Sequence, residues 1–383
     1  MATQKPFPSQ DPSPSQPPPS SVRPSSLASP PKKPPYFTAA FIGIGVIVII
    51  LAVFLGIRLR GGDQQVVLES EQKTVGIVQI WRRLDRFPAG FKEGLAELGY
   101  IEGKDIIYKY NSWEHDPTKI DAIVQGYIDE NVDMIFAVAA PSALRSLELT
   151  IQAQKEIPIV YVVVDKPDEI GLIESFQSSG NHVTGVASNM ADLVPKQLET
   201  LKRIDPDAKR IGVFNEGFKI PGNDAPGTFV LEALRKHTPT FGLQLVEYST
   251  QVPPGSELDK AFTDVASNIK PGDIDATYHI PGHFLVYQDV NEVDLGKGLG
   301  IPALMPIMEE VESSGGLFSV SGDSFEVGRQ TAVMADKVFR GTHPSQIPSE
   351  MPRKDIFTLN VTGAKELGIE IPQDVLDLAD VKF

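Results

Sequence analysis

The sequence predicts an α/β protein with two doubly wound, three-layer α/β/α lobes, preceded by one transmembrane helix. Apolar strand-like runs alternate with segments of helical spacing over residues 74–340. The alternation restarts near residue 191, which leaves enough chain on either side for a separate lobe. Residues 34–57 form a run without a charge. Strands separated by about 10–15 helical residues indicate βαβ units and a buried parallel sheet.

The N-terminal segment, residues 1–35, contains twelve prolines and eight serines. Such a segment buries too little apolar surface to offset the entropy lost on ordering. It is therefore predicted to be a disordered tail. Proline-rich segments also bind SH3-like or WW-like grooves, and this alternative stays open.

The transmembrane helix is predicted from Tyr36 to Ile57 (residues 36–57), within an uncharged run that lies between Lys33 and Arg58. About 22 residues at roughly 1.5 Å each match a hydrocarbon core near 30 Å. A cleavable signal peptide is the alternative, but its apolar region is about 7–15 residues long and precedes a small-residue cleavage site. The longer run and the charged residues that follow it favour a retained signal-anchor, with residues 58–73 as a linker.

Charge is unevenly distributed along the chain. Residues 1–60 hold six of the 35 basic side chains and one of the 50 acidic ones, Asp11, so the remainder is strongly acidic. Nucleic-acid binding depends on neutralising phosphates, so no nucleic-acid partner is predicted. The chain contains no cysteine, which excludes disulfides, thiolate metal sites, a cysteine nucleophile and a lipidated N-terminal cysteine.

The elements of the soluble part fall into two groups. In the first, strand-like runs cover residues 74–80, 105–110, 132–138 and 157–164, and helical patterns cover 90–98, 118–130 and a helix from residue 142. In the second, strand-like runs cover 210–214, 244–248, 276–280, 302–305 and 317–320, and helical patterns cover 193–204, 228–237, 256–269, 285–299 and 324–340. The predicted first lobe comprises residues 74–190 plus part of 318–383, and the second lobe, with crossovers, residues 191–317. Two such lobes bind ligands in the cleft where strand ends meet.

Residues 74–382 resemble a known family, the bacterial ABC-transporter substrate-binding proteins related to tryptophan- and tyrosine-binding members. Six segments carry the resemblance, namely residues 91–106 (FKEGLAELGYIEGKDI), 157–164, 183–186, 196–213, 325–348 and 358–380. The resemblance implies the type I periplasmic-binding-protein fold, with two lobes joined by three crossovers. It also implies that the binding domain is extracytoplasmic, so that the chain is a single-pass protein of the cell membrane. The family usually enters the envelope through a lipoprotein or cleavable signal, and this chain departs from that pattern.

Candidate ligand contacts follow the predicted strands. Gln79 and Trp81 follow the first strand, where Trp81 is predicted either to stack on a ligand or to pack within the lobe. Arg82 and Arg83 are predicted to pair with a ligand carboxylate or to form a solvated surface pair.

The turns after the third and fourth strands offer further candidates. Ser142 fits the first turn of a helix, where free N–H groups attract an anion. By resemblance, Ala140 and Ser142 receive the ligand carboxylate; helix capping is the alternative. Asp165 stands one position from the family's usual aspartate, and Lys166 occupies that place. Asp165 is a candidate for a ligand amine.

In the second lobe, Asn215 ends a strand, and Gly282-His283-Phe284 replaces a family turn rich in Asp, Asn and Thr. Asn215, His283 and Asp323 are the predicted ligand contacts there. His279 and His283 are separated by Pro281 and Gly282, so they lack the helical geometry of a zinc pair, and no metal or other cofactor is predicted.

Two functions fit these predictions. One is a solute-binding protein that captures a small ligand, such as an amino acid, for an ABC importer with permease and ATPase partners. The other is a membrane-tethered ligand sensor that acts on a partner membrane protein. An enzyme is not predicted, because the sequence contains no G-x-S-x-G elbow, P-loop or G-x-G-x-x-G motif.

Overall fold

The computed structural model describes residues 72–114, 116–215, 226–249, 258–281 and 289–383. Glu69–Phe383 form one compact unit, distinct from Met1–Leu68. The predicted tail, transmembrane helix and most of the linker lie outside the described residues. Within the described ranges, no helix is both long and apolar enough to cross a membrane.

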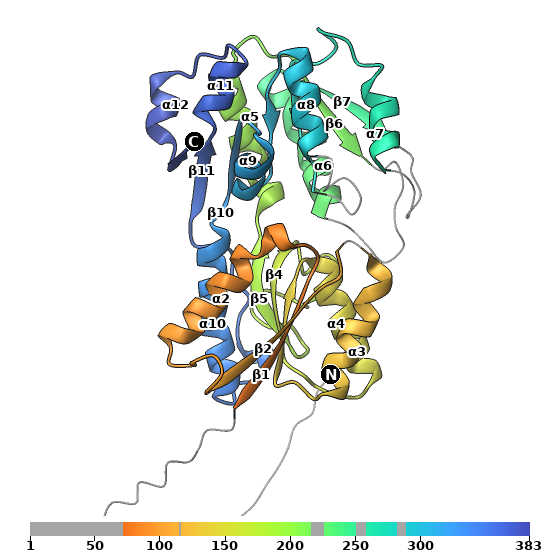
Figure 1. Cartoon of the computed structure of the whole chain (residues 1–383), viewed down its shortest axis with the longest axis vertical. Coiled ribbons are helices and arrows are strands. Elements are labelled where there is room, and N and C mark those ends of the chain that lie inside the picture. Colours follow the sequence, from red (N-terminus) through yellow and green to blue (C-terminus); the bar gives the residue numbers. More distant parts are fainter. Residues whose placement is uncertain (1–71, 115, 216–225, 250–257, 282–288) are drawn as a thin grey trace, which may run out of the picture. The chain divides into compact units, whose positions relative to one another are not determined.

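The first lobe is built on a parallel sheet with the strand order β2-β1-β3-β4-β5 (Figure 1). Its strands are β1 (Lys73–Gln79), β2 (Ile106–Ser112), β3 (Met134–Val138), β4 (Ile159–Asp165) and β5 (Val183–Ser188). Every residue of β3 is buried, and so is every residue of β5. Both faces of these strands are therefore covered, which explains why their sequences are almost continuously apolar.

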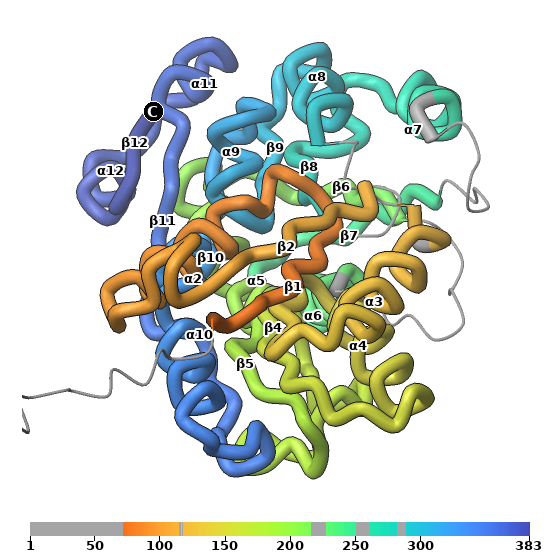
Figure 2. Tube along the Cα trace, turned by 60° about the horizontal axis from the view of Figure 1, so that its bottom comes forward, coloured from red at the N-terminus to blue at the C-terminus, as the bar shows by residue number. Residues whose placement is uncertain are grey.

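Helices cover the two faces of this sheet. They are α2 (Arg86–Glu97), α3 (Ile120–Asp129), α4 (Ala140–Gln152) and α10 (Ser324–Phe339), with short 3₁₀ turns η1 (Arg82–Leu84) and η2 (Pro117–Lys119). Side chains of a strand alternate between faces. Accordingly, Ile77 packs in the cluster that includes Phe91 of α2, whereas Val78 packs in the cluster that includes Val124 of α3. The helices on either side are visible in Figure 2.

The second lobe is built on a sheet with the strand order β12-β11-β10-β9-β8-β6-β7. Its strands are β6 (Arg210–Asn215), β7 (Gln244–Ser249), β8 (Ala276–Tyr278), β9 (Ala303–Leu304), β10 (Phe318–Gly322), β11 (Asp355–Leu359) and β12 (Val381–Lys382). Only the pairing of β10 with β11 is antiparallel among these described strands.

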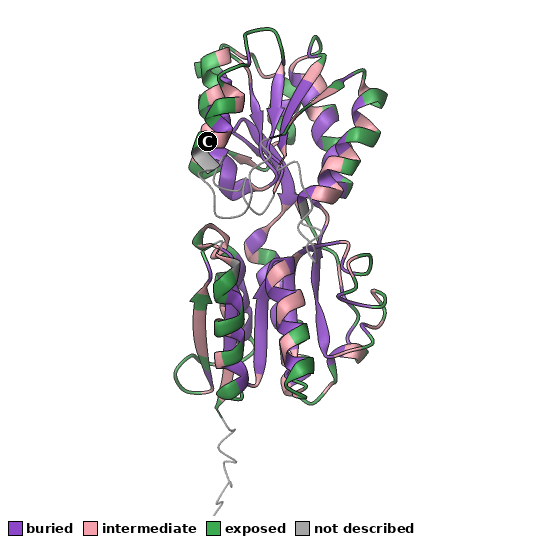
Figure 3. Cartoon of the chain, turned by 90° about the vertical axis from the view of Figure 1, so that its right-hand side faces the viewer, coloured by how far each residue is buried: buried purple, intermediate pink, exposed green. Residues whose placement is uncertain are grey.

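Helices also flank the second sheet. They are α5 (Met190–Ile204), α6 (Pro226–His237), α7 (Leu258–Ala266), α8 (Asp289–Leu299), α9 (Met308–Ser314), α11 (Val361–Glu366) and α12 (Gln373–Leu378), with 3₁₀ turns η3 (Thr238–Phe241) and η5 (Pro344–Gln346). Val213 of β6 belongs to the cluster around α5, and the adjacent Phe214 belongs to the cluster around Phe262 of α7. In Figure 3 the buried strands lie between helices whose outer faces are exposed.

The chain passes between the lobes three times. It leaves β5 for α5, leaves β10 for α10, and returns from residues near Glu350, which bridge to Val186, to β11. The helix α10 packs on α2 of the first lobe, although the strands before and after it belong to the second sheet. The second sheet therefore extends past residue 317, where the sequence patterns place the end of that lobe. The predicted two-lobe α/β fold with parallel sheets is confirmed, whereas the patterns do not indicate β5, β11 or β12.

Candidate functional site

The order of the strands marks where a ligand site belongs in each sheet. In the first sheet β1 lies between β2 and β3, so the connections that leave β1 and β3 run to opposite sides. In the second sheet β6 lies between β7 and β8 in the same way. A crevice opens at such a switch point, outside the carboxyl ends of the strands. The turns after β1, β3, β6 and β8 are therefore the candidate site.

At the end of β1, Gln79 joins a buried polar network. Its side-chain amide donates to Asp85 and to the hydroxyl of Tyr110, and Tyr110 donates to the same carboxylate. Burial, followed by the hydrogen bond to Asp85, raises the pKa of Tyr110. Gln79 is fully buried, and its amide oxygen has no hydrogen-bond partner within the part of the chain that the structure describes. The network ties β1 to β2 and to the residue before α2.

Trp81 lies just past the end of β1, after Ile80, and is half-buried. The guanidinium of Arg83 lies 4.1 Å from the centroid of its ring, which is cation–π geometry. The same guanidinium pairs with Asp289, a fully buried residue of the second lobe. Arg83 thus pairs with a carboxylate, as the sequence suggests, but the carboxylate belongs to the protein. Arg83, stacked on Trp81, therefore joins the two lobes at the switch point.

At the end of β3, Ser142 lies in the first turn of α4 and its side chain is fully buried. Its hydroxyl accepts a hydrogen bond of 3.0 Å from the indole nitrogen of Trp113, which is itself buried. Ala140 begins the same helix. Ser142 thus fixes the Trp113 ring behind the helix N-terminus, a role that the sequence does not indicate.

Replacing Ser142 by alanine is expected to destabilise the folded chain by about 1–3 kcal/mol, because the buried indole N–H loses its acceptor. Chemical denaturation measures this change, and Ser142→Thr, which retains the hydroxyl, distinguishes the lost bond from altered packing. Equal stability of Ser142→Ala and the parent chain would show that the hydrogen bond contributes nothing.

At the end of β4, Asp165 is buried and accepts a hydrogen bond of 3.3 Å from the amide of Ala191, at the start of α5. Burial raises the pKa of Asp165 to about 7, a shift that the bond from Ala191 only partly opposes. Its other carboxylate oxygen has no hydrogen-bond partner among the described residues. Lys166 pairs instead with Asp192 at 2.9 Å. Asp165 therefore lies at the crossover into the second lobe.

Backbone strain gathers at these strand ends. Ala139 has φ 74°, Val163 φ 58° and Lys166 φ 47°. This region is unfavourable for residues other than glycine, above all for a β-branched valine. Such strain persists where surrounding structure enforces it, and it is typical of ligand-binding segments. The strain at Val163 coincides with the register shift between β4 and β5, an irregularity that a sequence pattern cannot reveal.

The predicted residues of the second lobe lie apart. Asn215 donates to Glu247 of β7 at 3.2 Å. Asp323 caps α10 and accepts from the amides of Phe325 and Glu326 at 3.0 and 3.2 Å. His283 lies outside the described residues. The structure thus places Asn215 at the end of β6 and Asp323 at a crossover between the lobes.

A set of buried ionisable residues in the second lobe was missed by sequence reasoning. We call it the acidic cluster: His279, Asp289, Glu292, Glu309 and Glu310. The ring Nδ1 of His279 lies 3.1 Å from Glu292. Arg86 of the first lobe lies 3.2 Å from Glu309, beside the Arg83–Asp289 pair. Among the described residues, no group of three or more histidine or acidic side chains is arranged to hold a metal ion.

Burial dominates the electrostatics of the acidic cluster. It raises the pKa of Glu310 to about 8 and raises the pKa of Glu292 and Glu309. Burial alone lowers the pKa of His279, but the carboxylates of Glu292 and Glu310 outweigh it and raise that pKa to about 9. The sequence signal for this cluster is a pair of adjacent glutamates, 309 and 310, which precedes an apolar residue.

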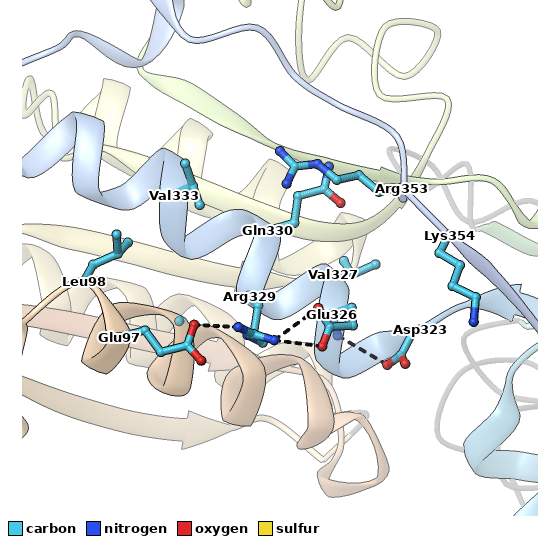
Figure 4. A pocket seen from close by; sticks show the side chains of 11 residues that line it. Glu97, Leu98, Asp323, Glu326, Val327, Arg329, Gln330, Val333, Arg353 and Lys354 are labelled. Atoms are coloured by element: carbon cyan, nitrogen blue, oxygen red, sulfur yellow. Dashed lines mark hydrogen bonds and ion pairs between the residues drawn. The ribbon is translucent and has the colours of Figure 1, made fainter.

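A separate hollow of about 450 Å³ lies beside α2 and α10 (Figure 4). Arg329 crosses it and bonds Glu97 at 2.6 Å and Glu326 at 3.1 Å. Of the predicted contacts, Asp323 lines it. Its walls come from helices and the third crossover rather than from the turns after β1 and β3, so it is distinct from the candidate site.

Comparison with known proteins defines the class. The family model described as ABC transporter substrate binding protein matches residues 75–382. The chain therefore belongs to this family of substrate-binding proteins, which confirms the resemblance seen in the sequence. The match covers both sheets and all three crossovers, and it assigns the chain to binding proteins rather than to enzymes.

Particular relatives are similar along most of the chain. A tyrosine-binding protein from Clostridioides difficile strain R20291 is 26% identical over 318 residues, which cover 82% of each chain. A conserved domain protein from Vibrio cholerae O1 biovar El Tor strain N16961 is 26% identical, with a TM-score of 0.71 over 82% of this chain and all of that one. A domain from Streptococcus pneumoniae in complex with L-Trp is 23% identical, with a TM-score of 0.69 over 82% of this chain and all of that one. The last of these supports the fold alone.

Proposed function

We propose that this chain is a membrane-anchored, extracytoplasmic solute-binding protein that captures a small ligand between its lobes for an ABC importer. The observation that carries the proposal is the contact at the switch point of the first sheet. There Arg83, whose guanidinium lies over the Trp81 ring, pairs with Asp289 of the other lobe. A ligand held between these groups would stabilise the closed conformation of the two lobes, which a permease recognises.

The ligand is proposed to be an amino acid or a related compound. One relative supports this class, since the similar protein from Clostridioides difficile is a tyrosine-binding protein. The proposed contacts are those expected from the sequence: Gln79, Trp81, Ala140, Ser142, Asp165, Asn215, His283 and Asp323. Trp81 is the foremost of these, because its ring lies beside the ion pair that joins the lobes.

The membrane arrangement is part of the proposal. Residues 36–57 would anchor the chain, residues 1–35 would lie in the cytoplasm, and the linker 58–73 would lead to the lobes outside. The first lobe would comprise residues 74–190 and the α10 region, and the second would comprise the rest. A membrane anchor in place of a lipidated cysteine is also consistent with a ligand sensor. Comparing uptake of the identified ligand by cells with and without the chain distinguishes a component of an importer from a sensor.

A thermal-shift screen of the full-length chain in detergent tests ligand binding. Tyrosine, tryptophan and the other amino acids are the probes. A ligand at 100 times its Kd adds about 2.7 kcal/mol to the free energy of unfolding, enough to raise the melting temperature by several degrees. Trp81→Ala is expected to abolish the shift and Trp81→Phe to retain part of it. No shift with any amino acid would exclude the proposed ligand class.

A further inference from the structure

Two arginines of the first lobe reach carboxylates of the second lobe from a single turn of the chain. Arg83 lies in η1 and Arg86 begins α2, so the two are three residues apart. This spacing places side chains side by side on a helical turn. Arg83 pairs with Asp289, and Nε of Arg86 lies 3.2 Å from the carboxylate of Glu309. The turn therefore makes two charged contacts between the lobes.

The carboxylate side of both contacts is enclosed. Asp289, the first residue of α8, has a fully buried side chain, and that of Glu309, in the first turn of α9, is 7% exposed. The side chains of Arg83 and Arg86 are 27% and 45% exposed. Removing the cation from a buried carboxylate costs far more than breaking an exposed pair. Separation of the lobes is therefore opposed at two points, and most strongly at the Arg83–Asp289 pair.

Asp85, which lies between the two arginines, fixes the turn against the first sheet. Its carboxylate accepts hydrogen bonds from the Gln79 amide at the end of β1 and from the Tyr110 hydroxyl in β2. The Trp81 ring supports the guanidinium of Arg83 from one side. Side chains that are already held in place lose less conformational freedom when they form a contact. The buried network around Gln79 thus directs the arginines toward the second lobe.

We propose that Arg83 and Arg86, on a turn fixed by Asp85, form an electrostatic latch that holds the two lobes together whether or not a ligand is bound. The latch shifts the equilibrium between separated and closed lobes toward the closed state. This inference goes beyond the proposed function, because it concerns the resting chain and names no ligand. Ligand entry then requires both ion pairs to break.

The distance between the lobes in the absence of ligand tests the latch. The chain contains no cysteine, so Ala122→Cys in α3 and Lys236→Cys in α6 introduce one spin-labelling site on an exposed position of each lobe. Pulsed electron paramagnetic resonance of the doubly labelled full-length chain in detergent is the measurement. With both arginines present, the distribution is expected to be dominated by one short distance, which is that of the closed lobes.

Variants of the ion pairs connect this distance to the latch. Arg83→Ala combined with Arg86→Ala is expected to raise the ratio of separated to closed lobes by at least about tenfold, since both contacts are lost. Arg83→Lys keeps the charge without the planar guanidinium and is expected to give an intermediate ratio. Asp289→Asn removes the charge from the other lobe with little change of shape, so it serves if the double arginine variant does not fold.

Two further variants separate the latch from general effects of substitution. Asp85→Ala leaves both arginines in place but removes the acceptor that fixes their turn, so it is expected to broaden the distribution toward longer distances. Arg203→Ala is the matched control, because it removes an arginine–carboxylate pair, with Asp374, that lies within the second lobe. It is expected to leave the distance distribution unchanged.

Two outcomes would overturn the latch. One is a parent chain whose lobes are mainly separated without ligand, and the other is the same short distance in the parent and in the chain that lacks both arginines. An unchanged distribution in Asp85→Ala would show that Asp85 does not position the turn. These results are independent of the thermal-shift screen, because the distance is measured without ligand. The latch therefore fails or stands separately from the proposed binding of an amino acid.

Discussion

The folded chain is expected to lose stability as the pH rises from about 5 to about 9, and Glu310→Gln is expected to remove part of that loss. Burial raises the pKa of Glu310 to about 8 and that of Asp165 to about 7. Between the unfolded and folded pKa values, the folded chain holds a proton that the unfolded chain has released. Stability therefore falls with rising pH in this window.

His279 acts in the same direction. Burial opposes its protonation, yet the carboxylates of Glu292 and Glu310 raise its pKa to about 9. A histidine with a raised pKa contributes stability that is complete below its unfolded pKa and is lost as the pH rises through the folded value. The raised pKa values of Glu310 and His279 thus change stability with pH in the same direction. Both make the folded state more stable toward pH 5–6.

Urea denaturation of the full-length chain at several pH values measures the effect. Each group contributes on the order of 1 kcal/mol per pH unit within its window. Glu310→Gln is expected to flatten the slope between about pH 5 and 8, because the glutamine has no proton to lose. Glu312→Gln, an exposed position on the same helix α9, is the matched control and is expected to keep the parent slope. Identical slopes for the parent and Glu310→Gln would contradict the buried, protonated state of Glu310.

The parts of the fold that the sequence predicts are those whose physical cause is local. Strands β1, β3 and β4 are covered on both faces, so their apolar runs are visible in the sequence. Strand β5 contains Thr184, Gly185 and Ser188, and β12 is two residues long, so both strands produce little pattern in the sequence. The crossover of β10 into α10 depends on packing between distant segments and has no local signal.

The candidate site likewise has one part that the sequence predicts and another that only the fold creates. Gln79, Ser142 and Asp165 lie at strand ends or helix starts, where strand order alone places them. The directions of their side chains depend on neighbours such as Trp113 and Ala191, which lie elsewhere in the chain. The acidic cluster is contributed by the residue after β8 and by α8 and α9, and Arg83 pairs with Asp289 across 206 residues. Only the fold brings these residues together.

The second large effect is expected where α10 packs on α2. Gly328 of α10 and Gly90 of α2 allow the two backbones to approach closely. A Cβ atom at Gly328 would lie 2.2 Å from the carbonyl oxygen of Phe87, and one at Gly90 would lie 1.9 Å from that of Phe325. Backbone atoms at these distances must move apart. Gly328→Ala is therefore expected to destabilise the folded chain by about 3 kcal/mol, at the upper end of overpacking effects.

Gly126→Ala in α3 is the matched control, because a Cβ there meets no atom within 4 Å. It is expected to raise stability by about 0.5–1 kcal/mol, since alanine favours a helix over glycine. Chemical denaturation compares the two variants. If Gly328→Ala were no less stable than Gly126→Ala, the close packing of α2 and α10 would be contradicted.

The same substitution is expected to act on the binding site. Helix α2 begins at Arg86, directly after the turn that contains Arg83, and both arginines pair with carboxylates of the second lobe. A shift of α2 away from α10 moves these side chains relative to Asp289 and Glu309. Gly328→Ala is therefore expected to weaken binding of the ligand found in the screen by about tenfold or more, because misplacement on the order of 1 Å is costly at a preorganised site. Unchanged affinity in a destabilised Gly328→Ala chain would show that the α2–α10 contact supports the fold without positioning the arginines.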